Sequence, residues 1–295
     1  MSQANPRQQQ IAGQLAVLLT AILWSSSGLF IKLLNWHPMV IIGSRSAFSI
    51  VFLLAVRFIV PPQKGVKSHP FPLWAGAAAY ALTMLTFVVA NKMTTSANVI
   101  MLQYSAPVWA ALLGWWLCRE KPHWEQWGAI VLVLAGLCLF LRDGLGTGAL
   151  LGDVLSVLSG IAFGANCVFL RMLKNGNPRD AMLLSHVICA VISIPFMFLY
   201  PPSLTVPSAL SVIYMGIVQL GLASLIYSYG MKRISAVQAM LTAIIEPILN
   251  PVWVLVITGE KPTAIALLGG TIIIGSVFAS SLIGMRREES MHSAS

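Results

Sequence analysis

The chain has 295 residues, of which 57% are hydrophobic and only 9% are charged, with 18 Lys and Arg against 9 Asp and Glu. Soluble domains carry about 25% charged residues, so a soluble chain of this length would hold about 74 of them rather than 27. The composition excludes a soluble core, a disordered chain and, despite a pI near 9.7, a nucleic-acid-binding domain. Most of the surface must face lipid.

Ten apolar stretches follow one another, each long enough for a helix that crosses a bilayer, which takes about 20 residues. The short breaks between them leave no room for a soluble domain, and runs of this length differ from the alternating strands of a β-barrel. The first stretch lacks a basic run before it and an A-x-A-like cleavage site, so we expect it to be retained rather than removed as a signal peptide. The predicted spans are 13–34, 39–60, 73–91, 96–117, 124–141, 149–172, 180–200, 208–229, 236–258 and 263–284.

Basic residues concentrate on one side of these spans. If the N-terminus is cytoplasmic, thirteen Lys and Arg lie inside, four lie outside (Lys32, Lys92, Arg142 and Lys261), and Arg45 lies within a span. The positive-inside rule therefore predicts that both termini are cytoplasmic. We expect a multi-pass protein of the cell membrane, most simply a bacterial inner membrane.

The sequence repeats with a shift of 139–140 residues. Each half holds five spans, an odd number, so the second half must enter the membrane from the opposite side. The prediction is an all-α integral membrane protein with ten transmembrane helices in a 5+5 inverted-topology repeat around a central cavity. Its units are residues 13–142 and 149–284, with cytoplasmic tails at 1–12 and 285–295. The matched positions include Trp24 with Phe163, Lys32 with Arg171, Lys92 with Lys232, Pro107 with Pro247, and Glu120 with Glu260.

Several motifs resemble those of the EamA-like transporters of the drug/metabolite transporter (DMT) superfamily. They are the Ala-Ile-Leu-Trp-Ser-Ser-Ser run that starts at Ala21, the segment 94–107 followed by Arg-Glu-Lys-Pro from Arg119, and Ile-Glu-Pro from Ile245 followed by Gly-Glu-Lys-Pro from Gly259. The resemblance covers almost the whole chain as two EamA units. It implies ten helices around a central cavity, spans five and ten at the periphery, and movement of amino acids, related metabolites or drugs, commonly outward.

Two prolines lie near the middle of predicted spans 4 and 9, at matched places in the repeat. Pro107 and Pro247 each remove a helical hydrogen bond and displace the carbonyl four residues earlier, that of Gln103 or Ala243. In lipid such a carbonyl must face protein or a wet cavity. A kink that only shapes packing is an equal alternative; the symmetric placement favours a hinge or a cavity wall.

Glu246 is the acidic residue that the pattern places deep within a span, where a carboxylate must be protonated, paired or in water. With Thr242 and Asn250 it forms a polar stripe on one helical face. It could bind substrate or carry a proton. We favour a structural carboxyl that satisfies backbone opened by the next proline, because Glu-Pro recurs here in the resembled family whatever the substrate. Ala106 stands at the matching position, so symmetry supplies no acidic partner.

Aromatic and small polar residues pair on spans 1 and 6. Trp24 with Ser27, and Phe163 with Asn166, follow i, i+3 spacing at equivalent places, which suits stacking and a directed hydrogen bond to an amphipathic metabolite. An aromatic packed between helices beside a satisfied Asn is an equally weighted alternative. The weaker candidates for a cavity wall, more often packing residues than ligands, are Tyr80, Phe87, Gln103 and Tyr227.

The remaining polar residues give no chemical motif. Arg45 could attract an anionic group, but we interpret it as structural because resembled proteins often keep an Arg outside the innermost path. His186 has no partner at ligand spacing, and the four cysteines have neither metal-ligand nor redox spacing. We therefore expect no metal and no cofactor.

The sequence bears on three classes of function. An intramembrane enzyme usually needs clustered acids, histidines or a metal motif, and an accessory membrane subunit does not need inverted repeats with broken helices. No nucleotide-binding loop is seen, so ATP is not the direct drive. We predict a secondary transporter, not an enzyme, that exports small polar or amphipathic metabolites by alternating access. It would act as a monomer or homodimer, and proton coupling stays open.

Overall fold

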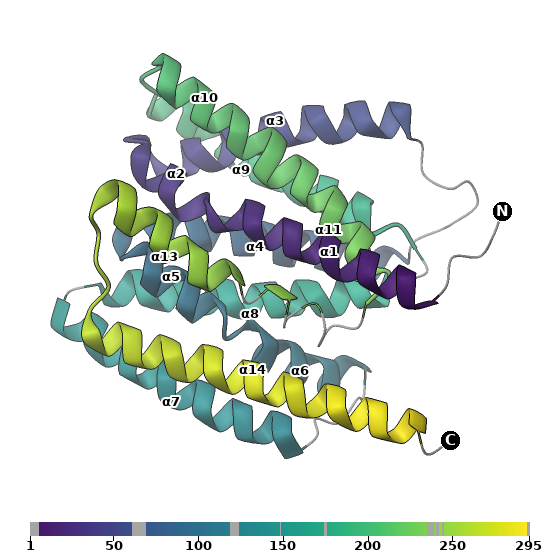
Figure 1. The fold of residues 1–295 in the computed structure, drawn as a ribbon. Helices are drawn as coiled ribbons and strands as arrows, with labels where there is room; N and C mark the ends of the chain where they lie inside the picture. The colour runs from purple at the N-terminus through teal and green to yellow at the C-terminus, as the bar shows by residue number, and fades with distance from the viewer. Residues whose placement is uncertain are drawn as a thin grey trace.

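The computed structural model describes residues 6–60, 69–118, 124–147, 149–173, 176–234, 239, 242–243 and 245–293, and all regular structure within them is helical (Figure 1). Six of the helical segments are long and apolar enough to cross a membrane. The chain is therefore a multi-pass membrane protein. The six segments are Gln8–Leu33, Pro38–Ile59 (α3), Pro70–Met93 (α4), Leu150–Met172 (α8), Pro178–Leu199 (α9) and Val206–Met231.

Five other helices occupy the four remaining predicted spans. Their apolar parts are shorter, as in Trp127–Gly136 and Leu267–Ser280, so the ten-span arrangement stays a prediction. Helix also extends into both predicted tails. The five helices are α5 (Ser96–Gln103), α6 (Ala106–Cys118), α7 (Trp124–Thr147), α13 (Ile245–Thr258) and α14 (Ala264–Ser293).

The helices form one bundle in which elements from the two halves of the chain alternate. α4 packs along α8, and α3 along α9, while α7 and α14 lie side by side at one edge, as expected for spans five and ten (Figure 1). Fully buried Ile41, Val88 and Ile100 belong to the core between these elements. The start of α1 and the end of α14 both lie at the right-hand end of the view, so the described part of the chain begins and ends at one end of the bundle (Figure 1).

Within the residues that the structure describes, three predicted spans are interrupted. The first divides at Ser26 into α1 (Pro6–Ser25) and α2 (Ser27–Leu33), and the fourth divides at Tyr104 and Ser105 between α5 and α6. The second break directly precedes Pro107, which has no N–H to donate to the carbonyl of Gln103. The polar backbone that these breaks free lies inside the protein, where side chains can reach it.

The third interruption is a π-helix. Predicted span 8 comprises α10 (Val206–Tyr214), the π-helix η1 (Met215–Leu222) and α11 (Ala223–Met231). A Cβ added at Gly216 would lie 2.4 Å from Cβ of Phe48 and 2.7 Å from the carbonyl oxygen of Arg45. The wider turn thus brings bare backbone against α3, and π-helical turns of this kind are frequent at functional sites.

Candidate functional site

Three aromatic rings meet at the centre of the bundle. The ring centroids of Trp24 on α1 and Phe163 on α8 are 6.2 Å apart at an interplanar angle of 78°, and Tyr227 on α11 lies 5.1 Å from Trp24. Edge-to-face and tilted pairs at these distances are favourable aromatic contacts. Nε1 of Trp24 is buried without a hydrogen-bond partner among the described residues. The two halves of the chain therefore contact each other through these rings. Nε1 of Trp24 is left to donate to a group that enters from outside the described residues.

Two cavities adjoin these rings and share five wall residues: Trp24, Gln103, Tyr104, Phe163 and Glu246. The first cavity extends along α1 past Val17 and Thr20. The second extends from Ser27 to Arg45. The remaining wall residues of the first cavity are Ala21, Ala106, Pro107, Cys167, Tyr227, Met231, Ala239 and Ala243, and those of the second are Tyr80, Thr83, Met84, Phe87, Gln219 and Leu220.

Tyr104, at the break in the fourth span, contacts residues of the ninth span. Its hydroxyl donates to the carbonyl oxygen of Ala243 at 2.5 Å and lies 3.1 Å from Oε2 of Glu246. The single proton of the Tyr104 hydroxyl cannot be donated to both acceptors at once. A protonated Glu246 could instead donate to the Tyr104 oxygen, so that both contacts would be hydrogen bonds. The Ala243 carbonyl, which Pro247 leaves without its helical donor, therefore has the protein partner that a bilayer interior demands.

The break between α5 and α6 is held against α8. Nε2 of Gln103 donates to Oγ of Ser159 at 3.0 Å, and that hydroxyl donates to the carbonyl of Thr83 at 3.2 Å. A Cβ at Gly160 would lie 2.9 Å from the Gln103 carbonyl and 2.8 Å from Oγ of Ser105. The Gln103 carbonyl thus faces protein, and α8 fixes the cavity wall that Gln103 contributes.

The π-helix is tied to the break in the first span. Nε2 of Gln219 donates to Oγ of Ser26 at 2.9 Å and approaches the carbonyl of Leu23 at 3.4 Å, while the Ser26 hydroxyl lies 3.3 Å from that of Tyr214. Oε1 of Gln219 has no partner among the described residues. Two irregular segments from opposite halves therefore meet beside the second cavity.

The cavities take in many, though not all, of the residues that the sequence suggested. Asn166 lies outside both walls, fully buried, and donates to the carbonyl of Gly76 at 2.9 Å. Asn250 packs against Gly28, where an added Cβ would lie 2.8 Å from its Oδ1. Thr242 and Pro247 are likewise not among the wall residues, so all four stay predictions as substrate or hinge residues. The predicted residues on the walls are Trp24, Ser27, Tyr80, Phe87, Gln103, Pro107, Phe163, Tyr227 and Glu246.

Sequence reasoning missed Tyr104 and did not place Arg45 in a cavity. Tyr104 has no distinguishing pattern, because its partners lie more than a hundred residues away in the second half. Arg45 could have been found from the rule that an ionisable residue within a span is first a functional candidate. For metals, the described residues contain no group of three or more His, Cys, Asp or Glu side chains that could hold an ion.

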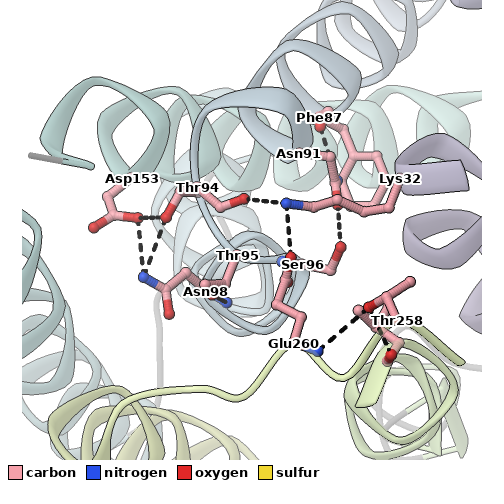
Figure 2. Close-up of polar contacts among 11 residues, drawn as sticks. Lys32, Phe87, Asn91, Thr94, Thr95, Ser96, Asn98, Asp153, Thr258 and Glu260 are labelled. Carbon is pink, nitrogen blue, oxygen red and sulfur yellow. Dashed lines mark hydrogen bonds and ion pairs between the residues drawn. The ribbon is translucent and has the colours of Figure 1, made fainter. Parts of the chain in front are cut away.

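A polar cluster lies at the end of the bundle away from the termini, where the connection from α13 to α14 runs (Figures 1 and 2). Nζ of Lys32 is 2.9 Å from Oε2 of Glu260 and also donates to the Thr94 carbonyl at 2.9 Å. Oε1 of Glu260 accepts the N–H of Ser96 at 2.7 Å, at the N-terminus of α5, where a carboxylate is favoured.

Asp153 completes this cluster from the start of α8. Its Oδ1 accepts the hydroxyl of Thr94 at 2.9 Å and Nδ2 of Asn98 at 3.3 Å (Figure 2). We call Lys32, Thr94, Ser96, Asn98, Asp153 and Glu260 the end cluster. Because it joins residues of both halves, the halves cannot separate at this end while it is intact.

Comparisons with known proteins identify relatives along almost the whole chain. The EamA-like transporter family model matches residues 11–142 and 150–282. Two uncharacterized transporters of Archaeoglobus fulgidus are 22% and 24% identical over 283 and 266 residues, which is 90% of this chain in each case and 96% and 94% of the relatives. The uncharacterized transporter YwfM of Bacillus subtilis is 26% identical over 264 residues, covering 86% of this chain and 88% of YwfM. A crystal structure that is 18% identical covers 95% of this chain and 99% of its own, with a TM-score of 0.68, which shows a shared fold.

Proposed function

This chain belongs to the EamA-like transporter family, and we propose that it is a secondary transporter that exports small polar or amphipathic metabolites, amino acids or related compounds, by alternating access. The family and the names of the relatives point to a transporter rather than an enzyme. The observation that carries the proposal is the pair of cavities with a common wall between the two halves. Outward direction is proposed from the family resemblance alone.

The walls suit an amphipathic compound. Trp24 and Phe163 offer aromatic faces, while Gln103, Ser27 and Glu246 offer polar groups beside them. Ligand sites typically combine a mainly apolar wall with a few placed polar groups. The second cavity has a volume of about 60 Å³, enough for several water molecules and too small for a metabolite. The helices around it would therefore have to separate when substrate enters.

Alternating access supplies that separation. In the 5+5 arrangement that we propose, the two inverted halves rock about the central site and open one end at a time. The end cluster supports this mechanism, since it holds the halves together at the end away from the termini (Figure 2). With ten spans in a bacterial inner membrane and cytoplasmic termini, this end would face outward.

Counterflow in proteoliposomes tests the proposal. Vesicles loaded with an unlabelled metabolite should accumulate the same labelled metabolite, for at least one member of a panel of amino acids and related compounds. Trp24→Ala, which removes one of the rings that line both cavities, should slow this exchange by about tenfold. The matched control is Trp116→Ala, because that side chain is 77% exposed on α6 and should leave exchange unchanged.

An intramembrane enzyme or an accessory subunit is the alternative. Either would give no counterflow with any compound of the panel, and an enzyme would convert the labelled compound instead. Chromatography of the vesicle contents after the assay distinguishes accumulation from conversion. Equal exchange by Trp24→Ala and Trp116→Ala would place the substrate path elsewhere.

A further inference from the structure

The second cavity contains a cationic side chain. Arg45, the eighth residue of α3, lines it together with Tyr80 and Gln219, although the side chain is only 2% exposed. Nε of Arg45 has no hydrogen-bond partner among the described residues. An ionisable group within a membrane span is costly unless it is paired, and it first suggests a functional site.

No carboxylate that the structure describes is paired with Arg45. Neither of the two ion pairs found among the described residues includes it. The four carboxylates whose side chains the structure describes have other contacts: Asp153 with Thr94 and Asn98, Asp180 with Arg57, Glu246 with Tyr104, and Glu260 with Lys32. The positive charge of Arg45 is therefore left for a group that enters the cavity.

The backbone of Arg45 is held in place by the π-helix. Any Cβ at Gly216 would lie 2.7 Å from the Arg45 carbonyl oxygen and 2.4 Å from Cβ of Phe48, so α3 and η1 are in direct contact at this turn. The backbone of Arg45 therefore lies directly against η1, at the wall of the second cavity. A backbone that is already held beside the cavity lowers the ordering cost when a ligand binds there.

We propose that Arg45 binds the carboxylate of the transported compound, so that the substrates are organic carboxylates with an apolar body. The planar guanidinium can donate two parallel hydrogen bonds to a carboxylate, which a Lys cannot do. Met84, Phe87 and Phe163 supply the apolar surface for the rest of the molecule. This assignment replaces the structural role that the sequence suggested for Arg45, and it rests on the proposed transport function.

The first test uses the whole purified chain in a detergent free of anionic lipid. Its thermal unfolding is measured with matched pairs of a carboxylate and its amide: leucine with leucinamide, and 4-methylpentanoate with 4-methylpentanamide. At least one carboxylate should raise the unfolding temperature, and its amide should not. Stabilisation by no carboxylate, or equally by both members of a pair, would overturn the proposal. Stabilisation only by phosphatidylglycerol would assign Arg45 to a lipid headgroup and overturn it as well.

The second test is counterflow of the same pairs in proteoliposomes. Wild type should exchange the carboxylate at least tenfold faster than the amide. Arg45→Gln should remove that preference. Arg45→Lys should keep part of it, because the positive charge remains although the two parallel hydrogen bonds of the guanidinium are lost. Arg57→Gln is the matched control on the same helix, since Arg57 pairs with Asp180 away from both cavities, and it should keep the preference.

The outcomes separate this inference from the transport function. A carboxylate preference that persists in folded Arg45→Gln would overturn the role of Arg45 and leave transport intact. Stabilisation by a carboxylate without counterflow of any compound would support the site and contradict transport. If Arg45→Gln does not fold, the first test decides whether the site binds a carboxylate. That test compares how much a carboxylate and its amide raise the unfolding temperature of the wild type.

Discussion

At the scale of single residues, the contact with Tyr104 explains how the carboxyl group of Glu246 can be buried within a membrane span. Glu246 is 7% exposed, and the Tyr104 hydroxyl lies between its Oε2 and the carbonyl that Pro247 leaves open. The arrangement is satisfied when Glu246 donates to the hydroxyl and the hydroxyl donates to Ala243. This hydrogen-bond arrangement favours a structural role for Glu246 over a role as a proton carrier.

We predict that Glu246→Gln keeps substrate exchange within about twofold of wild type, because an amide N–H can donate to Tyr104 as a protonated acid does. Glu246→Ala should lower the free energy of unfolding by about 1–3 kcal/mol, since it removes a buried hydrogen-bond partner. Exchange in proteoliposomes and thermal unfolding in detergent measure the two effects.

Tyr104→Phe is the control for the same contact. It removes the donor from the Ala243 carbonyl without changing the carboxyl, and it should destabilise the fold by a similar amount. If folded Glu246→Gln keeps exchange but loses uptake driven by a pH gradient, Glu246 is a proton carrier and the structural interpretation is wrong.

At the scale of elements, the π-helix fits against α3 only through bare backbone. We predict that Gly216→Ala lowers the free energy of unfolding by about 1–3 kcal/mol, because its methyl would overlap Phe48 and the carbonyl of Arg45. Gly275→Ala on α14 is the control, since a methyl there meets nothing within 4 Å and should be neutral or stabilising. Thermal unfolding measures both. Equal stability of the two variants would show that η1 does not depend on this close contact.

The sequence predicted elements better than it predicted their interruptions. Apolar length located the long helices, and Pro107 located the break in span 4, because a missing N–H acts within its own helix. The sequence did not predict the π-helix, because this helix depends on how Gly216 contacts α3, which is far away in the sequence. The same holds for individual contacts: the ring of Trp24 could be expected near Phe163, whereas the bond of Asn166 to Gly76 could not.

At the scale of the whole molecule, the distribution of basic residues predicts the orientation in the membrane. We predict that Cys at Ser203 is labelled by an impermeant thiol reagent from outside intact cells, and Cys at Ser68 only after permeabilisation, in a background without native cysteines. The reason is the thirteen-to-four excess of basic residues on the side of the termini. Ser68 itself lies outside the described residues. Opposite labelling of the two sites would reverse the topology.

The inverted repeat that the sequence predicts also suggests how the other end closes. Lys32 and Glu260, which pair in the end cluster, have Arg171 and Glu120 as their repeat equivalents (Figure 2). Inverted repeats exchange their arrangements when a transporter changes its open side. The pair at positions 171 and 120 should therefore close the end that holds the termini; Glu120 lies outside the described residues.

Reversible cross-linking tests both ends. In the background without native cysteines, we predict that a short, reducible bifunctional thiol reagent blocks counterflow in Lys32→Cys/Glu260→Cys and in Arg171→Cys/Glu120→Cys, and that reduction restores it. Each single Cys variant treated with the same reagent is the control and should keep most of its exchange, because modification of one residue cannot join the halves. Undiminished counterflow in a fully cross-linked Lys32→Cys/Glu260→Cys sample would mean that the end cluster never opens during transport. In that case substrate would not pass this end, and rocking of the two halves about the central cavities would not be the mechanism.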